Sequence, residues 1–155
     1  MIALKQVLVP TDFSETSEVA LKYGSALAQA FTSTLHVLHV IPDPYTQPWS
    51  VEATGVSITD LLRTWEADAK KRLETLVSAA ERESLKAELA TRVGHPFVEI
   101  VRYARDQNVD LIVMGTHGRG PVGHMLLGSV AEKVVRKAPC PVLTVRHPQH
   151  EFVRP

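Results

Sequence analysis

The sequence lacks several features that would assign a protein to a specialised class. Its single cysteine, Cys140, cannot form a disulfide within the chain. It has no excess of charge, because 17 basic and 17 acidic side chains cancel. Without a net charge, no overall field draws the protein to nucleic acid or to an anionic membrane. We therefore predict neither a nucleic-acid partner nor a membrane partner.

Long hydrophobic runs are also missing. An apolar run such as Leu111–Met114 is far too short to cross a bilayer. The first residues, Met1–Lys5, show no basic region followed by a long apolar stretch, as a secretory signal would have. Together with the single cysteine, this pattern predicts a cytoplasmic protein.

The remaining composition is that of an ordinary globular protein, with 45% hydrophobic and 22% charged residues. A chain of 155 residues has the length of one domain. A chain of this size buries about two-thirds of its unfolded surface. Since no repeat or linker interrupts it, we predict a single domain over residues 1–155.

Hydrophobic patterning predicts strands that alternate with helices. Short apolar or alternating runs predict strands, and amphipathic stretches predict helices. The predicted strands cover residues 7–9, 34–41, 85–93, 111–114 and 142–145, and the predicted helices cover 15–31, 57–83, 97–107 and 129–137. Strands joined by helical crossovers imply an α/β domain with a mainly parallel sheet and helices on both faces.

The two longer helices carry clear local signals. Ser14 is the predicted N-cap of the first helix, since its hydroxyl can accept a free backbone N–H. The apolar stripe of this helix is predicted to be Val19, Tyr23, Ala26, Leu27 and Ala30. The stripe of the second helix, which starts at Ser57 or Thr59 and ends near Glu83, is predicted to be Leu61, Leu62, Trp65, Ala69, Leu73, Leu76, Val77 and Ala80.

Glycine is concentrated in one segment. Of the 8 glycines, most lie between a predicted strand and a predicted helix, at Gly115, Gly118, Gly120, Gly123 and Gly128. In an open α/β sheet, ligands bind in the crevice at the carboxyl ends of the strands. Glycine lets backbone N–H groups approach an anion closely, and the start of the next helix adds free N–H groups and a positive dipole end. The segment is therefore predicted to bind phosphate.

Two common phosphate motifs do not fit this segment. Gly118–Gly123 matches the dinucleotide pattern G-x-G-x-x-G, but that motif belongs at the first strand-to-helix turn with an acidic residue about 20 positions later. Here that distance ends near Leu143 in the last predicted strand. The P-loop pattern G-x-x-x-x-G-K-[ST] fails because no lysine precedes Ser129.

A third pattern fits. Gly115-Thr116-His117-Gly118, nine further residues and Gly128-Ser129 form G-x-x-G-(nine)-G-[ST]. This spacing resembles the nucleotide-binding signature of the universal stress protein family. Further matching segments are 9–14 (Val-Pro-Thr-Asp-Phe-Ser), 38–41 (Leu-His-Val-Ile), 94–96 (Gly-His-Pro) and 138–143 (Ala-Pro-Cys-Pro-Val-Leu). The resemblance covers nearly the whole chain except the proline-rich loop 42–56.

The resemblance implies a doubly wound α/β fold, like that of the adenine nucleotide alpha-hydrolases. Its parallel sheet would have five strands in the order 3-2-1-4-5, and ATP would lie where strand 1 meets strand 4. A magnesium or manganese ion often accompanies the phosphates in such proteins. The implied nucleotide contacts are Pro10, Asp12, Val40, Met114, Gly115, Gly118, Arg119, Gly128, Ser129 and Val130.

These contacts would divide by role. Asp12 would hold the ribose or adenine side, Val40 would contact adenine, and Met114 with Gly115 would line the base and ribose. The phosphates would be held at Gly118, Gly128, Ser129 and the Val130 backbone. The chain departs from some ATP-binding members at Ala131, where they have a hydroxyl residue.

Several of these residues also have a simpler interpretation. Asp12 could simply terminate the first strand or assist the cap of the first helix, and Ser129 could be only an N-cap, a role compatible with phosphate contact. His117 and His124 could transfer protons but could equally be solvated loop residues. Arg119 could pair with phosphate or stay exposed without a partner.

Three other residues have no predicted ligand role. His36 and His39 lie three positions apart on one strand and so point to opposite faces, which argues against a shared metal ion. Cys140 lies between two prolines, and nothing nearby in the sequence would lower its pKa. We predict that none of these residues ligates a metal.

The predicted function is an ATP-binding, regulatory stress-response module without catalytic residues. The family resemblance implies a homodimer formed through the last strand, Val142–Val145. One alternative is a slow ATP hydrolase or phosphotransferase that uses His117, His124 or Arg119 in the same cleft. Another is an interaction protein that keeps the fold and has lost the nucleotide.

Overall fold

The computed structural model describes residues 1–46, 55–117 and 127–146. Within these ranges the strands are β1 (Gln6–Pro10), β2 (Thr34–Ile41), β3 (Glu88–Val93), β4 (Leu111–Gly115) and β5 (Val142–Val145). The helices are α1 (Glu15–Phe31), α2 (Ile58–Leu76), α3 (Ala79–Ser84), α4 (Pro96–Asp106) and α5 (Ser129–Lys137), with a short 3-10 helix at Pro44–Thr46.

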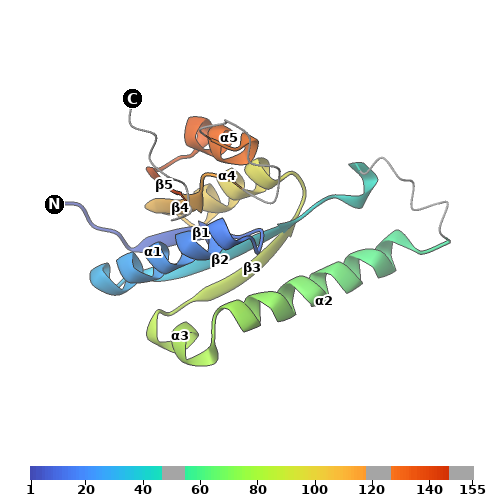
Figure 1. The fold of residues 1–155 in the computed structure, drawn as a ribbon, viewed down its shortest axis with the longest axis horizontal. Helices are drawn as coiled ribbons and strands as arrows, with labels where there is room; N and C mark the ends of the chain where they lie inside the picture. Colours follow the sequence, from blue (N-terminus) through green and yellow to red (C-terminus); the bar gives the residue numbers. More distant parts are fainter. Residues whose placement is uncertain (47–54, 118–126, 147–155) are drawn as a thin grey trace.

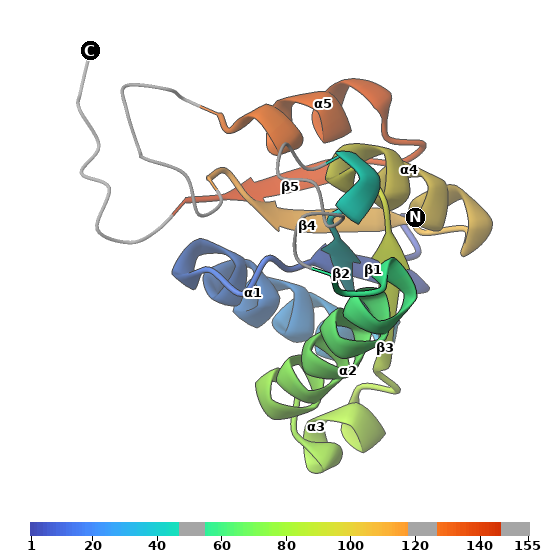
Figure 2. The ribbon, with the colours of Figure 1, turned by 90° about the vertical axis from the view of Figure 1, so that its right-hand side faces the viewer.

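All the strands pair in parallel, in the order β3-β2-β1-β4-β5. The helices α1 and α2 lie on one face of the sheet, and α4 and α5 lie on the other (Figures 1 and 2). This arrangement confirms the predicted doubly wound α/β fold and its strand order.

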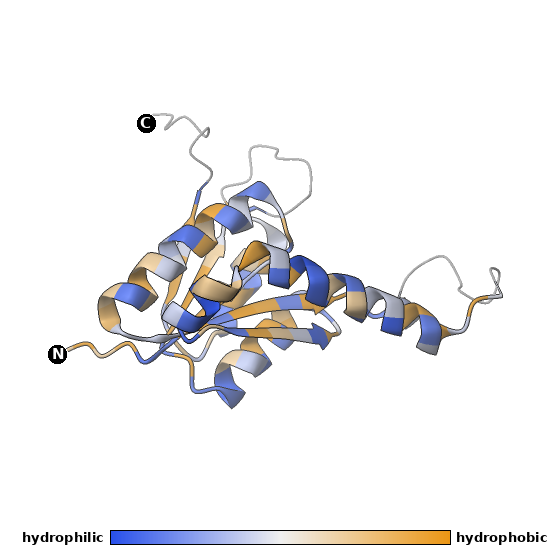
Figure 3. Ribbon diagram, turned by 90° about the horizontal axis from the view of Figure 1, so that it is seen from below, coloured by the Kyte–Doolittle hydropathy of each residue, from blue (hydrophilic) through white to orange (hydrophobic). Residues whose placement is uncertain are grey.

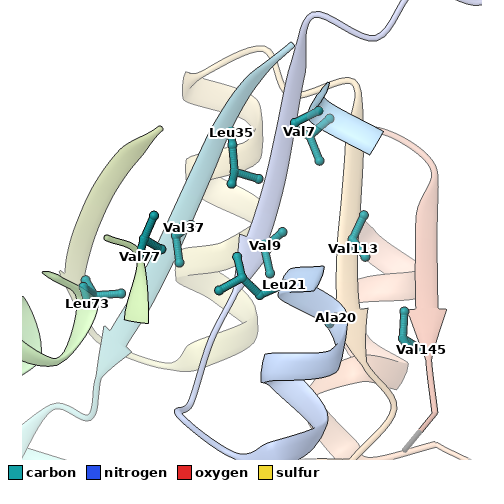
Figure 4. Packing of buried hydrophobic residues seen from close by; sticks show 11 residues of the cluster. Val7, Val9, Ala20, Leu21, Leu35, Val37, Leu73, Val77, Val113 and Val145 are labelled. Atoms are coloured by element: carbon teal, nitrogen blue, oxygen red, sulfur yellow. The ribbon is translucent and has the colours of Figure 1, made fainter. Parts of the chain in front are cut away.

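The hydrophobic core consists of two clusters, one on each face of the sheet. Side chains alternate along each strand, so Val7 and Val9 belong to the cluster under α1 and α2 (Figure 4), whereas Leu8 belongs to the cluster under α4 and α5. All three are fully buried. The helices carry hydrophilic and hydrophobic residues side by side along their length (Figure 3), as expected when one side of each helix faces a core.

The buried face of α1 differs from the prediction. Val19 and Leu27 pack partly against the core, but Tyr23, Ala26 and Ala30 are exposed. The buried residues are instead mainly small: Ser17, Ala20, Leu21, Gly24 and Ala28. The helix lies so close to β1 that a Cβ at Gly24 would overlap the Val9 side chain. The short distance between α1 and β1 therefore requires small residues on this face of the helix. A prediction based on large apolar side chains does not identify them.

The predicted helix over 57–83 is two helices. Val77 leaves α2 in an extended conformation with its side chain buried. Ser78 then starts α3 with a capping box, accepting from the Glu81 N–H while the Glu81 carboxylate accepts from the Ser78 N–H. Ala80, which the prediction placed in the core, is exposed, and Leu61, Leu62 and Trp65 are half-buried.

The strand predicted over 85–93 begins later, at Glu88. Lys86 has a left-handed backbone conformation with φ 48°, which interrupts extended structure just before the strand. Leu85, Ala87 and Leu89, at alternate positions, all pack against the cluster under α1 and α2.

Candidate functional site

The sheet has a topological switch point between β1 and β4. From β1 the chain adds β2 and β3 on one side, and it then adds β4 and β5 on the other side. Ligands of open α/β folds bind at such points, beyond the carboxyl ends of the strands. A cavity of about 530 Å³ lies there. Its lining includes eight of the predicted contacts: Pro10, Asp12, Val40, Met114, Gly115, Gly128, Ser129 and Val130. The other two, Gly118 and Arg119, lie outside the described residues, as does His124.

The loop from β1 to α1 holds one side of this cavity through a directed chain of hydrogen bonds. The Phe13 N–H donates to Thr11 Oγ1 at 3.0 Å. The Thr11 hydroxyl lies 3.1 Å from Ser17 Oγ, and the Ser17 hydroxyl donates to the Ser14 carbonyl at 2.8 Å. Since the Ser17 proton is used on Ser14, Thr11 must donate to Ser17. The chain of bonds keeps Phe13 in a left-handed conformation with φ 62°.

This loop also fixes Asp12. The Ser14 N–H donates to Asp12 Oδ1 at 3.0 Å, so the carboxylate is anchored beside the helix while Asp12 lines the cavity. Ser14 is the N-cap of α1 as predicted, because its side chain accepts from the Ser17 N–H. The capping and ligand interpretations of Asp12 are therefore compatible, since one carboxylate oxygen is sufficient for the loop.

The opposite side of the cavity is the start of α5. Gly128 is the N-cap of this helix and donates its N–H to the Thr116 carbonyl at 2.6 Å. Ser129 is the first helical residue, so the interpretation of Ser129 as N-cap is wrong. The N–H groups of a first helical turn have no acceptor within the helix, and the first three residues of α5, Ser129, Val130 and Ala131, line the cavity. They form a ready site for an anion.

A third side of the cavity is apolar. Val40 and Met114, which were predicted, are joined by Leu38, Pro96 and Ile100, which were not. Leu38 could have been found, because it lies two positions before Val40 on one strand and so shares its face. Pro96 and Ile100 belong to α4. Local sequence patterns do not show that α4 packs beside the carboxyl ends of β1 and β4, so these two contacts could not be predicted. Such a wall suits the flat face of an aromatic base.

Charge in the cavity is sparse. Among the described lining residues, Asp12 is the one carboxylate, and there is no lysine or arginine. Attraction for an anion at this part of the site therefore comes from backbone N–H groups and from the dipole of α5. His117 also lines the cavity, with Nδ1 2.9 Å from Thr116 Oγ1.

In the described ranges, no group of three His, Cys, Asp or Glu side chains could hold a metal ion. His36 and His39 point to opposite faces as predicted: His36 lies 3.0 Å from the Tyr103 hydroxyl of α4, whereas His39 packs on Phe13 and bonds the Thr11 carbonyl at 2.8 Å. Burial raises the pKa of Cys140, which agrees with an unreactive thiol.

His36 should make the stability of the fold depend on pH. Burial lowers its pKa, and the Glu88 carboxylate, 3.6 Å away and largely exposed, opposes this shift only in part. Gln6 Oε1, 2.7 Å from Nε2, can only accept, so Nε2 carries a proton, and in the neutral ring Nδ1 then accepts from the Tyr103 hydroxyl at 3.0 Å. The unfolded chain therefore takes up a proton first, at about pH 6.5. We expect full stability above that pH and a loss as the pH falls toward the lower pKa of the folded state.

Urea unfolding between pH 7.5 and 5 measures this loss. His36→Gln, which cannot titrate, should unfold with a weaker dependence on pH over this range, even though its stability at pH 7.5 is lower. An unchanged pH dependence in His36→Gln would assign the effect to other groups.

No helix in the described part of the chain is long and apolar enough to cross a bilayer.

Comparison with known proteins gives a consistent result. The model of the Universal stress protein family matches residues 3–146. Universal stress protein MJ0577 of Methanocaldococcus jannaschii is 33% identical over 156 residues, which cover 94% of this chain and 96% of that protein. The structure of universal stress protein UspA from Lactobacillus plantarum is similar with a TM-score of 0.78 at 25% identity, covering 94% of this chain and 100% of that one.

Two more distant structures contain adenine nucleotides. A universal stress protein in complex with cAMP has a TM-score of 0.62 at 22% identity, and the match covers 94% of this chain and 98% of that one. The universal stress protein from Archaeoglobus fulgidus in complex with dAMP has a TM-score of 0.59 at 23% identity and covers 94% and 99%. At these identities the likeness shows the shared fold.

Proposed function

The chain belongs to the universal stress protein family, and we propose that it binds ATP in the cavity between β1 and β4 and acts as a nucleotide-dependent regulatory module. The observation that carries the proposal is the convergence of eight predicted contacts on one cavity. Its volume of about 530 Å³ lies in the usual range for small-molecule sites, which is about 300–1,000 Å³. Two proteins of this fold are known with adenine nucleotides, which supports the ligand class.

The proposed pose follows from the three sides of the cavity. The adenine ring lies against Val40 and Met114, the ribose meets the Asp12 carboxylate, and the phosphates lie at the N-terminus of α5. Gly118 and Arg119 remain proposed phosphate contacts from the family resemblance. A magnesium or manganese ion would be held mainly by the phosphates, since the described residues offer no three-ligand cage.

Isothermal titration tests the ligand. We expect heat with ATP and weaker binding of adenosine, because adenosine has no phosphates to meet the N–H groups of α5. Nucleotide released from the purified, denatured protein, identified by chromatography, gives an independent measure. The absence of heat with ATP at submillimolar protein, with and without magnesium, would contradict the proposal and favour a nucleotide-free interaction protein.

An enzymatic role has one supporting observation, which is His117 in the cavity lining. Hydrolysis requires a positioned water and a base or a charge-stabilising group. We expect phosphate release to stay at the background rate. Release above background that falls in His117→Ala would support the slow hydrolase instead.

The proposal includes a homodimer formed through β5 and a cytoplasmic location. The strand β5 is at the edge of the sheet, and Leu143 on β5 and Val135 on α5 expose much of their apolar surface. Apolar side chains beside an open strand edge favour pairing with a second copy. Sedimentation velocity of the full chain measures the oligomeric state. The location rests on the single cysteine, Cys140.

A further inference from the structure

A second cavity, of about 540 Å³, lies at the side of the sheet that ends with β3. It is formed where α2 runs beside β3, with α3 at one end (Figures 1 and 2). Its lining shares no residue with the nucleotide cavity. We call it the α2–β3 groove. Its floor is apolar, with Leu73 of α2, Leu89 of β3 and the nearby Ala67, Ala87 and Ala90.

The groove reaches around the open edge of β3. Its lining contains Leu89, Ala90 and Thr91, three consecutive residues whose side chains alternate between the two faces of the sheet. A groove confined to one face would contact alternate residues. The backbone of β3 is therefore part of the groove wall, and β3 is the terminal strand of the sheet.

The hydrogen-bonding direction of this backbone can be assigned. The Gly94 N–H donates to the Ile41 carbonyl of β2, and the register of β3 on β2 is continuous from Glu88 to Val93. Backbone groups of successive strand residues point to opposite sides, so Leu89 and Thr91 direct N–H and C=O to the open edge. In agreement, the Arg92 side chain donates to the Thr91 carbonyl at 3.1 Å.

The charged residues of the groove favour an anion. Arg63, Lys70 and Arg82 line it together with Glu66 and Glu74, which leaves one excess positive charge. Arg82 also has an unsatisfied hydrogen-bond donor. In the described part of the chain, its Nε is the one buried side-chain nitrogen or oxygen without a hydrogen-bond partner. Because protein atoms enclose this Nε, a carboxylate in the groove would pair with the Nη groups of the same guanidinium.

The length of the groove suits a short extended segment. Its lining runs from Arg63 to Glu74 along α2, which spans about 16 Å at the helical rise. Along the strand it runs from Ala87 to Thr91, which spans about 13 Å. An extended chain of about four residues has this length.

We propose that the α2–β3 groove binds an extended peptide segment that carries a carboxylate side chain. The segment adds a strand to β3 by pairing with the Leu89 backbone and the Thr91 N–H, and its carboxylate pairs with Arg82. Alternate side chains of such a segment would meet the apolar floor, the usual arrangement in strand addition. This site would give a regulatory protein a docking surface separate from its nucleotide, and it does not depend on ATP binding.

Fluorescence anisotropy of a labelled Glu-Val-Thr-Val-Glu peptide, blocked at both ends, tests the proposal on the full chain. We expect saturable binding that Arg82→Met weakens about tenfold, the usual cost of losing a hydrogen bond to a charged group. Met keeps the apolar stem of the side chain. Arg105→Met, outside the groove, is the matched control and should bind normally.

A second pair of variants tests the strand edge. Thr91→Pro removes an N–H that points away from β2, a position where edge strands tolerate proline. It should weaken binding about tenfold by removing one edge hydrogen bond, whereas Thr91→Val, which keeps the N–H, should not. Equal ATP titrations and melting temperatures in all four variants show that the fold is intact.

Three results would overturn the proposal. These are the absence of peptide binding, equal binding of a peptide with lysine in place of glutamate, and equal affinity for free glutarate. The last result would assign the groove to small organic anions. None of these outcomes affects the ATP titration, so failure of the groove and failure of the nucleotide site are distinguishable.

Discussion

Replacing Gly128 with alanine is expected to weaken ATP binding by about tenfold or more, which is about 1.4 kcal/mol. A Cβ at this position would lie 2.9 Å from the Thr116 carbonyl oxygen. The Gly128 N–H donates a short hydrogen bond to the same oxygen, so the backbone cannot shift to accommodate the Cβ while this bond is kept. The start of α5 must therefore move, and with it the N–H groups of Ser129 and Val130 that are proposed to meet the phosphates.

Gly55→Ala is the matched control for this variant. Gly55 does not line the nucleotide cavity, and beyond its chain neighbours no atom of the described residues lies within 4 Å of an added Cβ there. Its left-handed backbone, with φ 68°, would cost some stability in the variant, but its ATP affinity should equal that of the wild type. Titration of both variants at a temperature where both are folded makes the comparison. Undiminished affinity in Gly128→Ala would show that the phosphates lie elsewhere.

Gly24→Ala is expected to destabilise the fold by about 1–2 kcal/mol, although alanine is the better helix former by about 1 kcal/mol. The added Cβ would overlap Cγ2 of the fully buried Val9 under α1. Overpacking forces either the helix or the strand to shift. For a chain of this size, the melting temperature should fall by about 2–8 °C.

A double-mutant cycle isolates this contact. The added Cβ would lie 3.8 Å from the Val9 Cβ, so Val9→Ala removes the overlap and leaves an ordinary contact. We expect Val9→Ala alone to cost stability through a cavity and the double variant to be more stable than the sum of the two changes predicts. Additive effects, or stabilisation by Gly24→Ala alone, would refute the proposed close approach of α1.

The predicted elements show where local patterns are sufficient. Several elements have the predicted bounds. They are the helices Glu15–Phe31 and Ser129–Lys137 and the strands Thr34–Ile41 and Val142–Val145. Each is delimited by local chemistry, such as the Ser14 cap or the change from helical to alternating patterning. The division of the long helix was missed, although Ser78 and Glu81 form a readable capping box, because the apolar stripe continues through Val77.

Part of the candidate site could also be predicted from the sequence. The glycine spacing selected residues 115–129 as a nucleotide signature, and the carboxyl ends of the strands then brought Asp12, Val40 and Gly128 to one cavity. The apolar wall from α4 could not be predicted, because Pro96 and Ile100 reach the site only through packing of α4 on the sheet. Their contribution depends on a contact between distant parts of the chain.

Patterning and spacing along the chain were thus enough to establish the α/β architecture, the phosphate-binding segment and, through the family resemblance, the strand order. Each of these depends on residues close together in the sequence or on a motif of constant spacing. Packing decided the rest: the small-residue face of α1, the apolar wall of the nucleotide cavity and the groove between α2 and the open edge of β3. These features arise from the distance between elements, which is set only when both faces of the sheet are covered.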